Sequence, residues 1–338
     1  MVERVWRCPE HSYWRVLPEA IGVRCRGCSR RLQRVASWLG LGDSFETAHR
    51  SLKEIYRFDL SQSTVRALTL EHAERITRHQ QRRVDQGVGR LPAKGAERII
   101  TQADGSFVNT VEPGRPRRGK RPRQWKEVRL CCALAKGAAR PVYGASFEGV
   151  EQTGRQWAFC AKEAGRGLKS RIHTVVDGAE WITLQARQRF GEQGRILLDF
   201  YHLSESLAEA SHRCRPQAPE RWRKTQQKRL KAGRWKQVLK ELEPLREAAS
   251  VPEEEAPVRR AWRYLSNRTD QLFYDEAIQE QLPIGSGIIE SGHKHVLQSR
   301  LKKSGIAWLP RSAETIAQAR TVIANEHWEL CWESSLTA

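Results

Sequence analysis

Two apolar segments of this chain each run into the dipeptide Asp-Gly, and these segments constrain the fold more than any other feature. Residues 98–108 carry Asp104-Gly105, and residues 170–177 end in Asp177 before Gly178. Short apolar runs of this kind are typical of buried strands. Further strands are predicted at residues 127–136, 141–147 and 195–199, with helices at 154–165 and 181–190. This succession of strands and helices predicts an α/β fold built on a mixed sheet.

The charge of the chain narrows the choice of partner. It has 59 Lys and Arg against 39 Asp and Glu, a formal net charge of +20 over 338 residues. Such an excess repels itself and is most simply explained by a polyanionic partner, of which nucleic acid is the commonest. There is no apolar run of about 18 residues that would predict a membrane span, and no secretory signal opens the sequence. We therefore expect a cytoplasmic protein that associates with the nucleoid by binding DNA and has no membrane partner.

Residues 1–40 carry two closely spaced pairs of metal-ligand residues. Cys8-x-x-His11 and Cys25-x-x-Cys28 can each direct two ligands at one ion, as tetrahedral zinc requires. We predict a structural Zn²⁺ site in a zinc-ribbon-like region; the alternative is that Cys8 and His11 are incidental. The other five cysteines are predicted to be ordinary thiols: Cys131, Cys132, Cys160, Cys214 and Cys331.

Residues 41–86 are predicted to form helices around a turn. Ser44 can cap a first helix, and Ser61 opens a second through Val65 and Leu68. Two helices joined in this way suit a helix-turn-helix, whose second helix enters the major groove of DNA. A small helical packing domain is the alternative. Residues 87–96 are rich in glycine and predict a linker.

The rest of the chain divides into three parts. Residues 97–202 hold the predicted strands and form the first part of the core. Residues 203–283 have no strand pattern and predict a helical insertion, in which residues 213–246 carry twelve Lys and Arg against three Glu. Trp222 and Trp235 in that stretch are expected to be core residues more than base-stacking ones. Residues 284–338 predict the last helices of the core.

Acidic residues at strand ends predict a metal site. An acid there is costly unless it is paired or binds a cation, and two or three carboxylates together suit Mg²⁺ or Mn²⁺. Glu290 follows Gly-Ser-Gly, which is expected to enter a helix and to place Lys294 one turn on along the same face. A third acid would allow two ions per site, the arrangement used for displacement at phosphorus. The alternatives are structural: a turn-capping Asp before Gly, and a first-turn Glu that complements the helix dipole.

A basic stretch lies between the first two predicted strands. Residues 114–126 hold seven cations together with Pro and Gly. A loop of this composition can follow DNA phosphates with salt-dependent affinity, or it can be a solvated hairpin tip. The predicted DNA-binding residues are Arg115, Arg117, Arg118, Lys120, Arg121 and Arg123, with Lys294 and Arg300 further along the chain.

Several motifs in a fixed order resemble a known family. They are Asp104-Gly105, Asp177-Gly178-Ala179-x-Trp181-Ile182, Asp199-x-x-His202, Gly285-Ser286-Gly287-x-Ile289-Glu290 and Arg300-Leu301-Lys302-x-Ser304-Gly305-x-x-Trp308. Over roughly residues 40–325 the chain resembles a bacterial insertion-sequence transposase of the ISKra type, in the Mutator-like DDE group. The resemblance implies an RNase H-like core interrupted by a helical insertion, with Asp104, Asp177 and Glu290 as the metal-binding catalytic triad.

The resemblance also implies an activity. Transposases of this group cleave DNA at the ends of an element and transfer the freed 3′-OH to target DNA. Terminal inverted repeats and target DNA would be the partners, and at least a homodimer is expected because two ends are cut together. Asp199 ends a strand too and competes with Asp177 as metal ligand; the family pattern makes Asp199 and His202 a near-site pair. The alternatives are a domesticated DNA-binding protein that no longer cleaves, and an RNase H-like nuclease.

Overall fold

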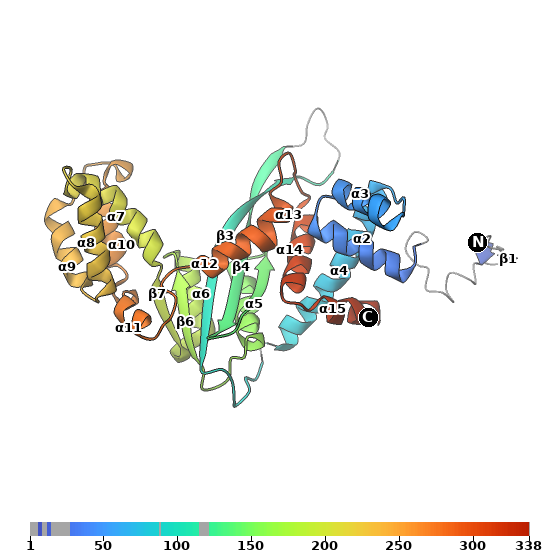
Figure 1. Ribbon diagram of the computed structural model, residues 1–338, viewed down its shortest axis with the longest axis horizontal. Coiled ribbons are helices and arrows are strands. Elements are labelled where there is room, and N and C mark those ends of the chain that lie inside the picture. Colours follow the sequence, from blue (N-terminus) through green and yellow to red (C-terminus); the bar gives the residue numbers. More distant parts are fainter. Residues whose placement is uncertain (1–5, 9–11, 15–27, 88, 115–121, 338) are drawn as a thin grey trace. The chain divides into compact units, whose positions relative to one another are not determined.

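The computed structural model describes residues 6–8, 12–14, 28–87, 89–114 and 122–337, and these form two compact units (Figure 1). The first unit comprises Met1–Asp85, Phe107–Glu127 and Lys294–Ala338, and the second comprises Gln86–Ser106 and Val128–His293. Both units are therefore assembled from segments that are distant in sequence.

The second unit is built on a five-stranded mixed sheet of order β5-β4-β3-β6-β7. β6 is parallel to both β3 and β7, whereas β4 and β5 are antiparallel to each other. The sheet confirms the predicted α/β class, and each strand lies within a few residues of its predicted position. The strands are β3 (Arg98–Val111), β4 (Arg123–Ala135), β5 (Val142–Ser146), β6 (Arg171–Val176) and β7 (Gly194–Leu198).

Successive residues of β3 pack into two different hydrophobic clusters. Ile99 belongs to a cluster with Trp157 of α5 (Val150–Glu163) and Phe190 of α6 (Glu180–Phe190). The next residue, Ile100, belongs to a second cluster that extends into the helices after β7. Because side chains alternate along a strand, this pattern shows that both faces of the sheet are covered. Figure 1 shows α5 and α6 beside the strands.

The residues between β7 and Glu290 form a helical bundle, as predicted for the insertion. Trp222 is buried and its indole Nε1 donates a hydrogen bond of 2.7 Å to Glu241 Oε1, while Trp235 packs against the same core. Their prediction as core residues is confirmed. The helices are α7 (Phe200–Cys214), α8 (Pro219–Lys231), α9 (Trp235–Leu242), α10 (Pro257–Ser266) and α11 (Tyr274–Gln279).

The chain after the bundle changes helix type within a few residues. α12 (Gly287–Gly292) carries Glu290 and continues into a π-helical turn at His293–Gln298, which is followed by α13 (Ser299–Leu301). Short π-helical turns are rare and are found often at functional sites.

Helices make up most of the first unit. Ser44 caps α3 and Ser61 Oγ accepts from Thr64 N at the start of α4, as predicted. One feature differs from expectation: α2 crosses the boundary predicted at residue 40, whereas α4 ends at Gly87, one residue beyond the boundary predicted at residue 86. No helix in the described part of the chain is long and apolar enough to cross a membrane. The unit contains α2 (Arg30–Gly42), α3 (Phe45–Tyr56), α4 (Gln62–Gly87), α14 (Pro310–Ala324) and α15 (Trp328–Thr337), and a two-stranded pair, β1 (Trp6–Cys8) and β2 (Ser12–Trp14).

Candidate metal centre

Three aspartates of the second unit lie at the carboxyl ends of neighbouring parallel strands. Asp177 follows β6 directly and Asp199 follows β7 directly. Asp104 lies two residues beyond Gln102, the last residue of β3 that pairs with β6. β3 itself continues to Val111, so Asp104 ends the parallel pairing and not the strand. Parallel strands place such side chains at one edge of the sheet, where α/β proteins commonly bind ligands.

Glu290 reaches the same edge because the segment before it is tied to the sheet. Asp199 Oδ2 accepts from Ser286 N, and Phe200 N donates to Ile284 O at 2.9 Å. Ser286 Oγ then donates to Glu290 Oε1 at 2.9 Å. A Cβ on Gly285 would lie 2.5 Å from the ring of Tyr201, so any other residue here would displace that side chain. The Gly-Ser-Gly motif therefore permits a close approach of backbone to α7 and orients the Glu290 carboxylate.

A buried glutamine provides a second tie. The side chain of Gln102 is fully buried; its Nε2 donates to Gly285 O at 3.0 Å, and its Oε1 accepts from Ile289 N at 2.9 Å. One residue of β3 thus holds both the approach to α12 and its first turn. Sequence reasoning missed Gln102, since an amide inside an apolar strand gives no signal of its own.

Like charges accumulate around Asp104. Its pKa is raised to about 6, first by burial and then by the negative charge of Asp177, with a smaller contribution from Glu290. Gly105 N, which donates to Asp104 Oδ1 at 2.7 Å, and the nearby His202 oppose the rise. Two members of the predicted triad, Asp177 and Glu290, therefore lie close enough to Asp104 to disfavour its charge. A divalent cation relieves repulsion of this kind.

Among the described residues, the three potential ligand atoms that the structure brings together belong to a set that differs from the predicted triad and contains neither Asp104 nor Asp177. Oxygen or nitrogen atoms of Asp199, His202 and Glu290 lie within 4.8 Å of one another, with Asp199 buried and the other two exposed. Asp199 already accepts three backbone hydrogen bonds, from Tyr201 N at 2.6 Å, His202 N at 3.0 Å and Ser286 N. A carboxylate offers about four lone-pair positions, so Asp199 has little capacity left.

Asp104 and Asp177 have more unused hydrogen-bonding capacity than Asp199. Asp104 accepts through Oδ1 from Gly105 N, and Asp177 through Oδ1 from Ala179 N at 2.8 Å. A carboxylate with one oxygen engaged by a turn can still present the other to a cation. On hydrogen-bonding capacity, Asp104 and Asp177 are therefore better suited to bind a metal than Asp199.

His293 is a second residue that sequence reasoning missed. Its imidazole is buried, and Nε2 lies 3.5 Å from Asp104 Oδ2. The spacing Glu290-x-x-His293 was the available signal, because residues three apart share a face of a helix. Lys294, which was expected one turn after Glu290, is instead an exposed residue of the π-helical turn.

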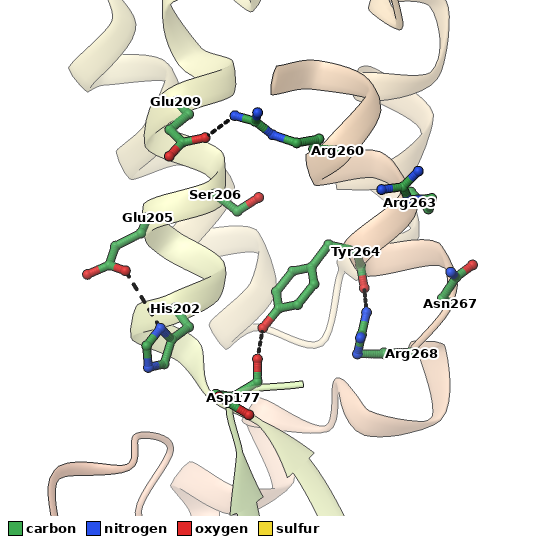
Figure 2. Close-up of a pocket in the computed structure, with 10 residues that line it drawn as sticks. All are labelled: Asp177, His202, Glu205, Ser206, Glu209, Arg260, Arg263, Tyr264, Asn267 and Arg268. Atoms are coloured by element: carbon green, nitrogen blue, oxygen red, sulfur yellow. Dashed lines mark hydrogen bonds and ion pairs between the residues drawn. The ribbon is translucent and has the colours of Figure 1, made fainter. Parts of the chain in front are cut away.

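The turn that follows β6 is held from the helical bundle (Figure 2). Tyr264 of α10 donates its hydroxyl to Asp177 O, and Arg268 Nη2 donates to Gly178 O at 2.7 Å. Gly178 adopts a φ of +94°, and a Cβ on it would lie 2.8 Å from the Tyr264 ring. Only glycine fits this left-handed, closely covered position. The insertion thus fixes the backbone that carries the Asp177 carboxylate.

Beside this turn, α7 and α10 bound a cavity of about 510 Å³. Figure 2 shows Asp177 at one end of it, His202 and Glu205 on the α7 side and Tyr264 opposite. His202 Nδ1 lies 3.6 Å from Glu205 Oε2. The cavity opens beside Asp177, one of the predicted metal ligands.

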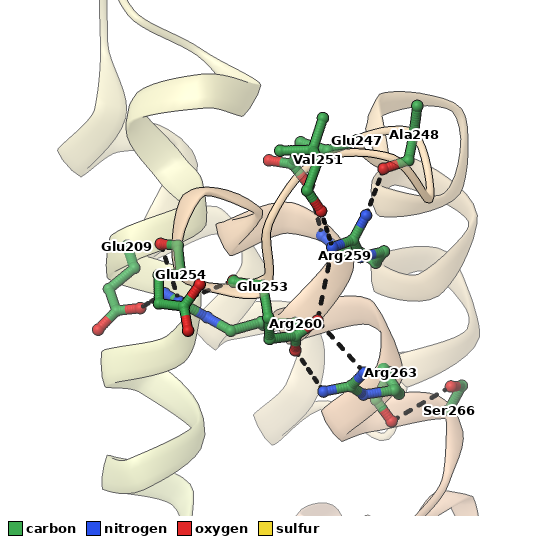
Figure 3. Close-up of polar contacts among 10 residues, drawn as sticks. All are labelled: Glu209, Glu247, Ala248, Val251, Glu253, Glu254, Arg259, Arg260, Arg263 and Ser266. Carbon is green, nitrogen blue, oxygen red and sulfur yellow. Dashed lines mark hydrogen bonds and ion pairs between the residues drawn. The ribbon is translucent and has the colours of Figure 1, made fainter.

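The arginines of α10 are largely used to hold the bundle together. Arg260 contacts Glu209 of α7 and donates to the Glu253 and Glu254 carbonyls at 3.1 Å, while Arg263 pairs with the Glu253 carboxylate (Figure 3). These contacts connect α10 to α7 and to the loop before α10. The position of Tyr264 over the Asp177 turn is therefore supported by the contacts that its own helix makes one turn earlier.

The predicted DNA-binding residues have different environments. Arg115, Arg117, Arg118, Lys120 and Arg121 lie outside the described residues. Arg123, at the start of β4, is exposed, as is Lys294. Arg300 is instead only 1% exposed, and its guanidinium lies between the rings of Phe45 and Trp308.

The predicted zinc ligands lie mostly outside the described part. This holds for the side chain of Cys8 and for His11 and Cys25. Cys28 is buried in the apolar cluster of α2, α3 and α4, and burial raises the pKa of its thiol. A thiolate ligand would have to overcome that cost. Of the five cysteines predicted to be ordinary thiols, Cys214 is partly exposed and the other four are buried.

Comparison with known proteins gives one family match. Residues 164–329 match the model of an uncharacterised protein family (UPF0236). No curated protein matches the chain. The matched region contains Asp177, Asp199 and Glu290 and the whole helical insertion, whereas Asp104 lies outside it.

Proposed function

We propose that this protein is a DDE-type transposase that cleaves DNA at the ends of an insertion sequence and joins the freed 3′-OH to target DNA. The observation that carries the proposal is the gathering of Asp104, Asp177 and Glu290 at one edge of the sheet, with the pKa of Asp104 raised by its acidic neighbours. Acids held together without a nearby cation are expensive, and a site for divalent metal explains why they are held there.

The residues fit a hard divalent cation. The donors are carboxylate oxygens, with the imidazole of His202 nearby, and oxygen donors are those that Mg²⁺ and Mn²⁺ prefer. We propose that Asp104, Asp177 and Glu290 hold two ions. When bound, such ions lower the pKa of an attacking hydroxyl and neutralise charge on the leaving oxygen during displacement at phosphorus.

The protein's own groups supply position. Ser286 and Gln102 orient α12 and its carboxylate, and Tyr264 with Arg268 holds the turn of Asp177. A site fixed in this way needs little reorganisation when substrate binds. The cavity between α7 and α10, which opens at Asp177, is the place we assign to the DNA strand near the reacting phosphate.

The fold supports the same proposal. A sheet with a parallel side that carries the acids and an antiparallel side, interrupted by helices before the last acid, is what an RNase H-like core of the resembled family implies. α3 and α4 form two helices around a capped turn, as a helix-turn-helix requires. We propose that this region, with a zinc ribbon before it, binds the terminal repeats, and that the active form is at least a dimer.

The decisive experiment is a Mn²⁺-dependent assay on a plasmid that carries the DNA flanking the gene. Wild type is compared with Asp177→Asn, which keeps an oxygen for Ala179 N, and with Glu180→Gln as matched control, since Glu180 is an exposed acid at the start of α6. We expect joined products from wild type and Glu180→Gln, and none from Asp177→Asn.

The other outcomes are equally informative. Nicking without joining by wild type would favour an RNase H-like nuclease. Binding without any cleavage would favour a DNA-binding protein that has lost its activity. Equal cleavage by Asp177→Asn would transfer the metal-ligand role to Asp199.

A further inference from the structure

The first unit contains a cavity that the proposed cleavage chemistry does not use. It has a volume of about 460 Å³ and lies at the amino-terminal ends of three helices. Ser44, Phe45 and Glu46 line it from the start of α3, Gln62 from the start of α4, and Ser312 from the first turn of α14. The amino-terminal end of a helix carries partial positive charge and unpaired backbone N–H groups. Three such ends around one space favour an anion.

The start of α14 has backbone donors to spare. Its N-cap is Leu309, which makes no side-chain capping hydrogen bond, and Pro310 follows at the first position. An apolar N-cap leaves the N–H groups of Arg311 and Ser312 without the side-chain acceptor that Ser44 gives α3. An oxyanion at the helix start would satisfy such groups.

A buried arginine in the wall gives an independent indication of a ligand. Arg300 lines the cavity and is 1% exposed. Its Nε donates to Gly40 O at 3.0 Å, and its guanidinium lies 4.6 Å from the Phe45 ring centroid and 4.7 Å from that of Trp308. Within the described residues, Nη2 is buried and has no hydrogen-bond partner. An unsatisfied guanidinium nitrogen at such a place is costly.

The surroundings of Arg300 do not neutralise it. Burial, and then the charge of Arg320, lower its pKa to about 10, so the guanidinium stays charged at neutral pH. Arg320 donates to the carbonyls of Leu41 and His295, and Asp43, whose negative charge partly offsets that of Arg300 and Arg320, is paired with Lys303. Across the parts of the chain that are described, no carboxylate lies within ion-pair distance of Arg300 or Arg320.

Two charged residues at the rim act in opposite senses. Arg66 of α4 lines the cavity and is exposed, so it can move toward an anion. Glu46 also lines it, but its carboxylate is 3.4 Å from Arg50 Nη2, which partly compensates its charge. The balance at the cavity is positive.

We propose that this cavity is a phosphate-binding site, held by the ends of α3 and α14 and by Arg66 and Arg300, and that the phosphate belongs to a DNA backbone. Phosphate has the size, charge and acceptor oxygens that helix ends and guanidinium groups recognise together. The site would fix the position of one DNA strand on the first unit and carries no part of the cleavage chemistry.

The first test uses inorganic phosphate as the probe, on the full-length protein without added divalent metal. Thermal unfolding is followed in phosphate and in chloride at equal ionic strength. We expect phosphate to raise the midpoint of wild type by several degrees. Ser312→Asp should abolish the rise while keeping the fold, since an acid in the first turn of a helix favours the helix.

Two further pairs of variants sharpen this test. Arg66→Gln should reduce the rise, whereas Arg78→Gln, at another exposed arginine of α4, should not. Glu46→Gln should increase it, because a repelling charge is removed. An equal rise in wild type, Ser312→Asp and Arg66→Gln would overturn the site.

The second test identifies the source of the phosphate by fluorescence anisotropy of a labelled duplex. If the phosphate belongs to DNA, Ser312→Asp and Arg66→Gln should weaken binding at least fivefold relative to Arg78→Gln. Unchanged DNA binding together with a lost phosphate effect would assign the site to free phosphate and overturn the DNA part of the proposal. Neither test measures cleavage, so both can be interpreted even if the protein proves to have no cleavage activity.

Discussion

At the scale of single residues, Asp177 and Asp199 have the same place in the sequence pattern but different surroundings. Both directly follow a parallel strand. Asp199 is fully buried and accepts from three backbone N–H groups, whereas Asp177 is partly exposed and accepts from one. The sequence could place both acids at the sheet edge. It could not separate their roles, because the partners of Asp199 include Ser286, which lies far along the chain.

This difference predicts unequal effects on stability. Asp199→Ala leaves one buried and two part-buried backbone donors without their acceptor, so it should lower the free energy of unfolding by about 2–4 kcal/mol. Asp177→Ala removes one capping bond but also relieves repulsion with Asp104, so its cost should be below about 1 kcal/mol. Urea unfolding at pH 7 measures both. Equal losses would show that Asp177 is as structural as Asp199.

The raised pKa of Asp104 predicts a dependence on pH. Its value in the folded protein, about 6, lies above the 3.8 of an unperturbed aspartate, so the folded state binds the proton more tightly. The free energy of unfolding should therefore fall as pH rises from about 4 to about 6. The side chain is 37% exposed, and solvent screening limits the effect to about 1 kcal/mol.

Asp104→Asn should remove this dependence. In chelator-treated protein, we expect the variant to be more stable than wild type at pH 7 and equal to it near pH 4. Adding Mn²⁺ at pH 7 should stabilise wild type more than the variant. Denaturation curves at the two pH values check the first expectation, and a difference between the proteins that does not change with pH would contradict it.

At the scale of elements, the strands and the helical character of the insertion followed from the sequence, whereas two helical features did not. α2 was hidden because Cys25 and Cys28 suggested a zinc ribbon up to residue 40, although Ser29 is a good N-cap for it. The π-helical turn after α12 has no sequence signal, since π-helices depend on tertiary contacts. The hydrogen bonds from α10 and Arg268 to the Asp177 turn could not be predicted either, because they join two segments that are distant in sequence.

The hydrogen bond from Tyr264 to the Asp177 turn predicts that Tyr264→Phe affects cleavage more than DNA binding. Loss of the hydroxyl removes the bond to Asp177 O and should cost about 1 kcal/mol of stability. It should also lower DNA cleavage while leaving duplex affinity unchanged, because the carboxylate is less well positioned. Tyr274→Phe is the matched control, as Tyr274 is buried and donates to Leu198 O at 2.9 Å. Similar cleavage losses in both variants would reduce the role of Tyr264 to general stability.

At the scale of the whole molecule, the net charge of +20 predicts a polyanionic partner, and DNA binding stays a prediction. The net charge could not indicate which cations would face a polyanion, and Arg260 and Arg263 of α10 prove to be paired with acids of the helical bundle. The division into two units of interleaved segments was also beyond sequence reasoning, because units of that kind depend on contacts between distant residues.

The charge predicts strongly salt-dependent DNA binding. Affinity for a duplex should fall by at least about tenfold between 50 and 200 mM salt, because bound phosphates release counterions. Replacing Arg115, Arg117 and Arg118 with Gln should make a plot of log affinity against log salt less steep. Anisotropy titrations at several salt concentrations give the slope, and an unchanged slope would show that this stretch does not contact DNA.

The helical bundle leaves the sheet at Phe200 and returns at Ile284, and a single backbone hydrogen bond joins these two points. The chain therefore enters and leaves the bundle at adjacent points. The bundle can lengthen, shrink or be exchanged during evolution without altering the order of the strands. Yet the same bundle carries Tyr264, which reaches back to the turn of Asp177. A lineage that discarded it would keep the order of the strands but would expose the apolar face on which Ile100, Leu197 and Leu198 pack against the bundle, and would lose the support of the Asp177 turn.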